Sequence, residues 1–471
     1  MNLKHLGIIA GLLLTISCHA WYTTLNQADP YPFFTSQYPM SFLNTEKKQI
    51  LKGLEPLGIK ERLDFSIGLF GQKASSATND KKEKCSLLDY NGRLNMVGLT
   101  YGAIPNGQIQ PSLLTLAGSQ PIKGLATPAG TEINANFNDA DYSDPTYNLG
   151  FYTVNAKYNK IGVRLQASFK PIEDFVIEVQ GGFAELTQTY TYEYFLDRTD
   201  LATATGAFPG QDMQSTPFAQ NQQTVEQYFM DMRNEIFDQL GFNTTEWHKS
   251  GAEDFTISGI VRHNFVANKN ADPEEWTSFT VTPFLQAGYT FGIAKSSDPD
   301  YLLSIPLGGN NKHNAFRLRG GFSLDFFNTI EVCSDACYSH FNSRTITTRV
   351  PTSEFQSLLF PYKTQVEVKP GPSWDFTIGF NAYQFLDKLS FYGIYIYAAH
   401  TKDSITLTTP DAAFLPEQLE NLTEWKTQMF DIGFNYNLSP HTTFGIAFQL
   451  PVERRSAYKS YTSLLSMITT F

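Results

Sequence analysis

The sequence predicts an all-β fold, a transmembrane antiparallel up-and-down β-barrel of about 12 strands with long extracellular loops and short periplasmic turns. Three observations lead to this fold class. Long segments alternate between apolar and polar residues, short and long connections alternate along the chain, and no internal apolar run reaches the roughly 18 residues of a membrane helix.

Composition excludes several classes of protein. The 471 residues are 42% hydrophobic, 14% aromatic and 17% charged, which is too apolar and aromatic for a disordered chain. The mean hydropathy of -0.25 is that of an ordinary polar chain and argues against a helical membrane protein.

The first twenty residues, MNLKHLGIIAGLLLTISCHA, have the pattern of a cleaved secretory signal peptide at residues 1–20. Cleavage after Ala20 removes Lys4, so the formal charge of -11 becomes -12 (-11 minus 1). Such an acidic chain is a poor partner for nucleic acid. The alternative is a lipid anchor on Cys18, although Thr15 stands where a lipoprotein signal prefers Leu.

Residues 21–60 form a separate N-terminal segment, expected in the periplasm. It begins with WYTTLNQADPYPFF and continues with a stretch in which Ile50, Leu51 and Leu54 share one helical face. The segment is interpreted either as a plug or cap of the barrel or as a plain tether. The barrel itself is expected to occupy residues 61–471.

The strands are read from their period of two. In residues 276–294, one face is apolar from Phe279 to Ile293, and the other is mostly small or polar. In residues 315–327, Arg317, Arg319 and Asp325 oppose an aromatic face. Such a strand fits a membrane barrel, where the aromatic face meets lipid and the charged face meets a wet lumen. It also fits a soluble sandwich, where the aromatic face meets the core and the charged face meets water.

Connection lengths favour the barrel. The links at 170–174, 328–329, 385–388 and 437–441 are short, whereas those at about 187–254, 294–314, 342–372, 398–424 and 451–462 are long. Strict alternation of this kind is expected when tight turns occupy one rim and loops the other. The expected strands are 62–72, 157–169, 175–188, 254–265, 277–293, 315–327, 330–341, 373–384, 388–398, 426–437, 441–450 and 462–471, and residues 92–102 would raise the count if they joined the wall.

The chain ends in SLLSMITTF, and here it resembles the bacterial outer-membrane β-barrel (porin-like) family, whose last strand commonly finishes in Phe. The resemblance implies outer-membrane localisation in a Gram-negative bacterium, lipid around the wall, and recognition of Phe471 by the barrel assembly machinery. Trp276, Tyr289, Phe291 and Trp374 then suit the aromatic girdles at the membrane surfaces.

Two further features lie outside the wall. Residues 224–241 predict a loop helix with a capping box at Thr224 and an end at Gly241, which either constricts the lumen or stabilises its own loop. Cys85, Cys333 and Cys337 remain after signal removal, and their pairing is left open. Cys333 and Cys337 would lie about 13 Å apart in an extended strand, so neither a disulfide nor a metal site with Asp335 and His340 is expected.

These inferences predict a channel for passive diffusion of small hydrophilic solutes. The alternatives are a structural or adhesive barrel with a plugged lumen and, more remotely, a barrel enzyme. No catalytic signature, cofactor or metal is expected, and His263 is the one outward-facing barrel histidine. Whether barrels associate into homo-oligomers stays open. The side chains expected to line the pore are six acids and four arginines: Asp64, Arg164, Glu178, Arg262, Arg317, Arg319, Asp325, Glu331, Asp375 and Asp431.

Overall fold

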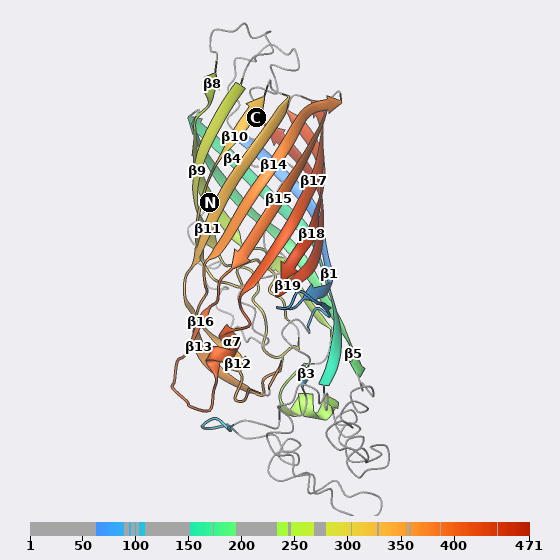
Figure 1. The fold of residues 1–471 in the computed structure, drawn as a ribbon, viewed down its shortest axis with the longest axis vertical. Helices are drawn as coiled ribbons and strands as arrows, with labels where there is room; N and C mark the ends of the chain where they lie inside the picture. Colours follow the sequence, from blue (N-terminus) through green and yellow to red (C-terminus); the bar gives the residue numbers. More distant parts are fainter. Residues whose placement is uncertain are drawn as a thin grey trace, which may run out of the picture.

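Twelve long antiparallel strands of the described chain close into a barrel in the computed structural model (Figure 1). None of the described helices is long and apolar enough to cross a membrane. The structure describes residues 63–88, 94–95, 99, 103–108, 151–172, 174–194, 233–243, 246–267, 279–302, 304–326, 329–354, 356–357, 359–386, 388–439 and 441–471. The signal peptide, the N-terminal segment, Thr224 and Trp276 lie outside these ranges.

The wall strands follow one another around the ring in chain order, which confirms the expected all-β barrel. They are β1 (Leu63–Thr78), β4 (Phe151–Ile172), β5 (Phe175–Tyr194), β7 (Phe255–Arg262), β9 (Phe279–Phe291), β10 (Ala315–Phe326), β11 (Ile330–Phe341), β14 (Ser373–Leu386), β15 (Leu389–His400), β17 (Trp425–Ser439), β18 (Thr442–Arg455) and β19 (Ala457–Thr470).

The ring closes because β1 pairs with β19 on one edge and with β4 on the other. Gln72 connects all three strands. Its amide donates to Thr462 of β19 at 3.0 Å, and its carbonyl oxygen accepts from the Tyr158 hydroxyl of β4 at 2.8 Å. A closed ring leaves no strand edge without a hydrogen-bonding partner, as a span through lipid requires.

The wall has an apolar outer face, suited to lipid, and a polar inner face, suited to a lumen. The outward set is large and apolar, with Leu69 54% exposed and Phe183 63% exposed. The inward set is polar and buried, as in β4, where Lys160, Arg164 and Gln166 follow at every second position. This chain therefore folds as a transmembrane barrel of the outer-membrane type.

Two expected connections differ from the structure. The long link at 451–462 is wrong, because β18 and β19 meet at a tight turn on Ser456, whose φ is 50°. The link after β7 breaks the strict alternation on the other rim, since 263–278 is longer than a hairpin turn and contains the short β8 (Phe265–Ala267). Of residues 92–102 the structure describes 94–95 and 99, and there β3 (Leu94–Asn95) pairs with the loop end of β4.

One wall strand is broken by a bulge. β6 (Trp247–Ala252) and β7 both pair with β5, and their registers differ by one residue around Glu253 and Asp254. A bulge turns extra side chains to one face of a sheet, and both of these acids are buried. Gly182, opposite the bulge, leaves space that a Cβ would fill, since that atom would lie 2.6 Å from Glu253 Oε2.

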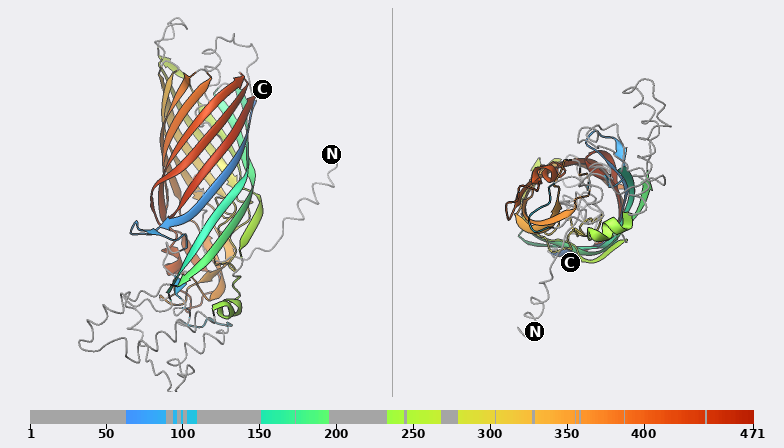
Figure 2. Two further views of the ribbon diagram at one scale, coloured as in Figure 1. Left: turned by 90° about the vertical axis from the view of Figure 1, so that its right-hand side faces the viewer. Right: turned by 90° about the horizontal axis from the view of Figure 1, so that it is seen from below.

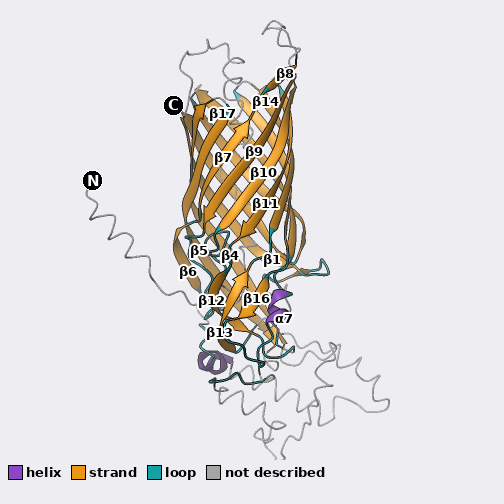
Figure 3. Ribbon diagram, turned by 90° about the vertical axis from the view of Figure 1, so that its left-hand side faces the viewer, coloured by secondary structure: helices purple, strands orange, loops and turns teal. Residues whose placement is uncertain are grey.

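Folded loops lie at the end of the barrel away from the short turns (Figure 2). A small sheet there consists of β12 (Arg344–Val350), β13 (Tyr362–Lys369) and β16 (Ser404–Leu407), and α7 (Pro416–Glu420) packs beside β16. Figure 3 shows this sheet and α7 beyond the loop ends of the wall strands. We call the sheet, α7 and the described parts of 233–243, 294–314 and 351–361 the loop cluster.

The loop cluster buries apolar side chains of its own. Val350, Val366 and Val368 are fully buried in the small sheet, with Leu419 of α7 in the same core. Leu302, Ile305 and Leu307 instead belong to the core that includes wall residues. The loop cluster is thus attached to the barrel by hydrophobic packing as well as by the chain.

Candidate solute pathway in the barrel lumen

The inner face of the wall carries all ten side chains expected to line a pore. Each has the inward parity of its strand, where alternate residues are buried, whereas its neighbours include the exposed apolar residues. Whether they border an open pore stays a prediction. Several of these side chains are paired with further polar residues.

The first lumen network unites two cations with one acid. Arg164 donates from Nε and Nη2 to the two oxygens of Glu253, at 3.0 and 3.1 Å. Lys160 lies 2.6 Å from Glu253 Oε1, and the Arg164 guanidinium stacks 4.1 Å above the centre of the Phe70 ring. Asp254, the next residue of the bulge, is also buried and interacts electrostatically with Lys160 and Glu253, so two buried acids oppose the two buried cations.

The second network crosses β10, β11 and β14. Arg319 donates to Asp335 from Nε at 2.7 Å and from Nη2 at 2.8 Å, and the Thr377 hydroxyl donates to Asp335 Oδ2 at 2.5 Å. Arg317 and Arg319 both lie within electrostatic reach of Asp375. Acids on two neighbouring strands therefore lie near the arginine pair, and Asp335, which binds Arg319 directly, is not among the ten expected residues.

Two more acids are held by neutral donors. Glu178 accepts from the Gln166 amide at 2.6 Å and from the Gln180 amide. Glu331 accepts from the hydroxyls of Ser323 and Tyr383. Neutral donors thus satisfy the carboxylate oxygens of these two buried groups.

The opposite side of the lumen is more apolar. On β15, β17, β18 and β19 the buried inner positions include Ile394, Met429, Ala447 and Leu464. Asp431 is the acid of the expected list on this side, and it is 1% exposed. This side of the lumen therefore carries few charges, and its buried inner positions combine aliphatic side chains with neutral polar ones such as Asn435, Gln449 and Ser466.

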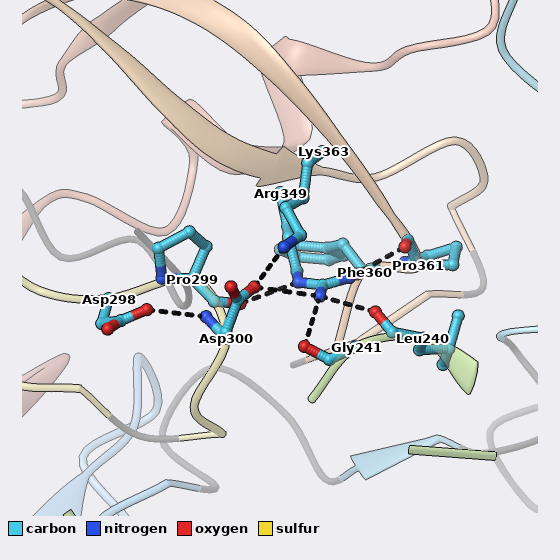
Figure 4. Close-up of polar contacts among 9 residues, drawn as sticks. All are labelled: Leu240, Gly241, Asp298, Pro299, Asp300, Arg349, Phe360, Pro361 and Lys363. Atoms are coloured by element: carbon cyan, nitrogen blue, oxygen red, sulfur yellow. Dashed lines mark hydrogen bonds and ion pairs between the residues drawn. The ribbon is translucent and has the colours of Figure 1, made fainter. Parts of the chain in front are cut away.

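Arg349 of β12 fixes the loop cluster from within (Figure 4). Its guanidinium donates to the carbonyl oxygens of Leu240 at 2.7 Å, Pro299 at 2.8 Å and Pro361 at 2.8 Å. It also lies 3.8 Å from the centre of the Phe242 ring. One side chain thus joins the end of the loop helix, the 294–314 connection and the β12–β13 link.

The charge on Arg349 is poorly compensated. Burial lowers its pKa to about 10, while Asp300 opposes this shift from 3.4 Å. Arg349 is still protonated at neutral pH, and its partners are mainly carbonyl oxygens. Asp300 is shared with Lys363 of β13, which forms a close ion pair with it. Such a buried cation is costly to leave without its acceptors.

The described part of the loop helix covers 233–239 and ends as the sequence predicts. Gly241 has a φ of 68°, and its N–H donates to Asp238 O at 2.9 Å. Ile236, Phe237 and Leu240 are buried in the core shared with the wall. The helix therefore belongs to the loop cluster, and Arg349 occupies its free carbonyl end.

A serine, a histidine and an aspartate lie in a row at the loop ends of β14 and β15. Ser373 Oγ is 2.9 Å from His400 Nδ1, and His400 Nε2 is 2.8 Å from Asp403 Oδ1. The row is buried, with the ring of Trp425 stacked on His400 at 5.8 Å. Asp403 also accepts from the Gly371 N–H at 2.7 Å, so the row ties the loop base together and has no exposed nucleophile.

The remaining candidates do not form a site within the described residues. No disulfide there joins Cys85, Cys333 and Cys337, and the Cys333 thiol donates to Gly379 O at 3.3 Å. Asp335 is paired with Arg319 and His340 lies on the opposite, exposed face, and no described cluster of His, Cys, Asp and Glu can hold a metal ion. His263 lies 2.8 Å from Asp174 in an exposed pair at the turn rim.

The sequence reasoning missed Lys160, Glu253 and Asp335. Lys160 lies on the same face of its strand as Arg164, so the alternation alone could have predicted it. Glu253 lies at the bulge, where the alternation changes face. Asp335 lies in the polar run CSDAC, where the alternation of apolar and polar residues is lost.

Comparisons with known proteins agree with the fold class only. No family model matches the chain, and no curated protein matches it. Among solved structures, an outer-membrane channel from Pseudomonas putida F1 is 7% identical, with 88% of this chain and 97% of that chain covered and a TM-score of 0.40. The translocator domain of the autotransporter NalP from Neisseria meningitidis is 7% identical, with 92% and 95% covered and a TM-score of 0.32.

A third solved structure is the toluene transporter TodX of Pseudomonas putida, 10% identical, with 97% and 100% of the two chains covered and a TM-score of 0.28. Likenesses this distant carry no inference about solute or partner. The assignment to outer-membrane barrels rests on the closed ring and its apolar outer face.

Proposed function

We propose that this protein is an outer-membrane channel for the passive diffusion of small hydrophilic solutes, with the loop cluster acting as its gate. The observation that carries the proposal is the inner face, where polar and charged side chains recur on the wall strands beneath an apolar exterior. A barrel without a transport role has no need to bury so many charges, since each costs desolvation energy.

The inner charges suit selection by charge. The paired arginines on β10 lie beside the acids of β11 and β14, so positive and negative groups stand next to each other along one part of the inner wall. A twelve-stranded barrel leaves a narrower lumen than the sixteen-stranded porins, and a solute there passes close to these groups.

The gate is assigned to the loop cluster because it lies across one end of the barrel and is held by Arg349 (Figures 1 and 4). Replacing Arg349 with Gln removes the charge and most of the donors. In planar bilayers, Arg349→Gln should raise the open probability relative to wild type, and Lys363→Gln, at the edge of the same group, serves as the matched control with a smaller effect.

A second candidate function is a closed surface barrel whose loops bind or adhere. The shared core of Leu302, Ile305, Leu307 and wall residues favours it, because that packing would plug the loop end. Absence of conductance from both wild type and Arg349→Gln, with the protein folded and inserted, would overturn the channel proposal in favour of this one.

A further inference from the structure

The inner wall of β14, β15, β17 and β18 contains a group of buried polar atoms without hydrogen-bond partners among the described residues. They are Asn381 Oδ1, Tyr392 Oη, both carboxylate oxygens of Asp431, Asn435 Oδ1 and Gln449 Nε2. All five side chains are at least nine-tenths buried. We call the four residues whose unpartnered atoms are oxygens, Asn381, Tyr392, Asp431 and Asn435, the acceptor patch.

Strand pairing places these four residues side by side. Asn381 is directly opposite Tyr392, and Tyr392 is opposite Gly433. The tip of the Tyr392 ring lies over Gly433, where a Cβ would meet Tyr392 Cζ at 2.1 Å. Asp431 and Asn435 flank Gly433 at two residues on either side, so the acceptor patch extends about 13 Å along β17.

Three acids elsewhere in the lumen have donors, unlike Asp431. Arg319 satisfies Asp335, two glutamine amides satisfy Glu178, and two hydroxyls satisfy Glu331. Gln449 faces Asp431 across the β17–β18 pair, and its amide is the donor beside that carboxylate, but the contact falls short of hydrogen-bond geometry. Burying a carboxylate without a donor is among the most costly arrangements in a protein interior.

The residues around Asp431 indicate which kind of ligand could bind its carboxylate. Ile394 is opposite Asp431 in the β15–β17 pair, and Met429 and Ala447 are buried on the same inner wall. One carboxylate among neutral oxygens is too few ligands for a divalent metal ion. A positive nitrogen with several N–H donors and an aliphatic chain matches both the oxygens and the apolar neighbours.

We propose that the acceptor patch is a binding station for small alkylammonium solutes, with the ammonium group on Asp431 and the aliphatic chain on Ile394 and Met429. The proposal rests on the channel function proposed above. The ammonium donates to the Asp431 oxygens, and the Tyr392 and Asn435 oxygens accept from further donors of longer solutes. Entry is from the turn end, because the loop cluster lies across the other.

The test uses n-butylammonium as the probe and n-butanol as its neutral counterpart. Titration calorimetry of the folded protein in detergent should show binding of n-butylammonium and none of n-butanol. Asp431→Asn should weaken that binding about tenfold or more, since one partner of a buried charge pair is lost. Asp325→Asn, which removes a carboxylate elsewhere in the lumen, should change it less than about twofold.

Tyr392→Phe keeps the ring over Gly433 and removes only the hydroxyl, so it tests the site if Asp431→Asn folds poorly. In bilayers, n-butylammonium should block the potassium current at concentrations that follow the calorimetric affinity. Binding of n-butylammonium without any current would support the binding station and contradict the channel function. A current with no n-butylammonium binding, or equal binding by wild type and Asp431→Asn, would overturn the station and show that ordered water alone satisfies the patch.

Discussion

Arg319 and Asp335 form a two-fold hydrogen-bonded ion pair between β10 and β11, on the inner face of the barrel. Asp335 is nearly fully buried, and Thr377 donates to the same carboxylate. Of the two neighbouring arginines on β10, Arg319 is therefore held in place by its ion pair with Asp335. Arg317, by contrast, retains a buried Nε with no hydrogen-bond partner among the described residues.

Loss of Arg319 alone should destabilise the barrel more than loss of the whole pair. Arg319→Ala leaves a buried carboxylate unpaired, which costs about 3–5 kcal/mol in comparable sites, whereas Arg319→Ala with Asp335→Ala removes both charges. The measurement is the temperature at which the compact band disappears on unboiled gels. Equal shifts for the single and the double variant would argue against the pairing described here.

Arg317 should contribute more than Arg319 to ion selectivity, because its charge is less compensated by a close partner. We expect Arg317→Ala to move the reversal potential in a potassium chloride gradient toward cations. The Arg319→Ala, Asp335→Ala double variant should shift it less, because it removes one positive and one negative charge and leaves the net charge of the lumen unchanged. An equal or larger shift from that double variant would contradict this ranking.

Ser373 should not react as a catalytic serine, although His400 and Asp403 are aligned with it. The row is buried beneath Trp425, and Asp403 is occupied by a backbone N–H. A fluorophosphonate probe applied to the folded protein should leave Ser373 unlabelled. Labelling that is abolished by Ser373→Ala would contradict this and revive the barrel-enzyme alternative.

Lys249 provides a pH dependence at the loop end. It donates to Ser296 O at 2.7 Å, and burial lowers its pKa from 10.5 to about 8, opposed by Asp298. Between these values the folded state binds fewer protons than the unfolded state, so stability should rise with pH from about 8 to 10.5. Protease resistance of the loop cluster measures this, and Lys249→Met should flatten the profile.

Deletion of Phe471 should reduce barrel assembly more than Phe322→Ala. The Phe471 backbone exchanges two hydrogen bonds with Leu63, at 3.2 and 2.8 Å, where β1 meets β19. The outer-membrane family resemblance further implies that this residue is read by the assembly machinery. Surface levels of the two variants provide the measurement, and equal levels would remove support for both roles.

The strands were predictable where lipid and lumen impose opposite demands on alternate residues. β10 and β11 begin and end within a residue or two of the expected positions. The alternation fades beyond the membrane, where both sides of the wall meet water or loops. That is why β4 begins at Phe151 rather than 157, and why β18 continues to Arg455 instead of entering a loop at 451.

The candidate site was predictable only as a set of inward side chains. Parity places Arg164 and Arg319 in the lumen, but their partners depend on a bulge at Glu253 and on register between β10 and β11. The Arg349 contacts join segments more than a hundred residues apart, as with Leu240 at a separation of 109. No local pattern encodes contacts of that range.

The bridge made by Gln72 has a consequence for the order of folding. Its partner Thr462 is 390 residues away in the chain, whereas β4 is available to β1 much sooner. The wall can therefore grow as an open sheet, but its two edge strands expose unpaired backbone N–H and C=O groups until β19 pairs with β1. We therefore expect the pairing of β1 with β19 to be the slow, late step of folding. Until that step, a chaperone or a docking surface would have to shield the two unpaired sheet edges of the nascent barrel.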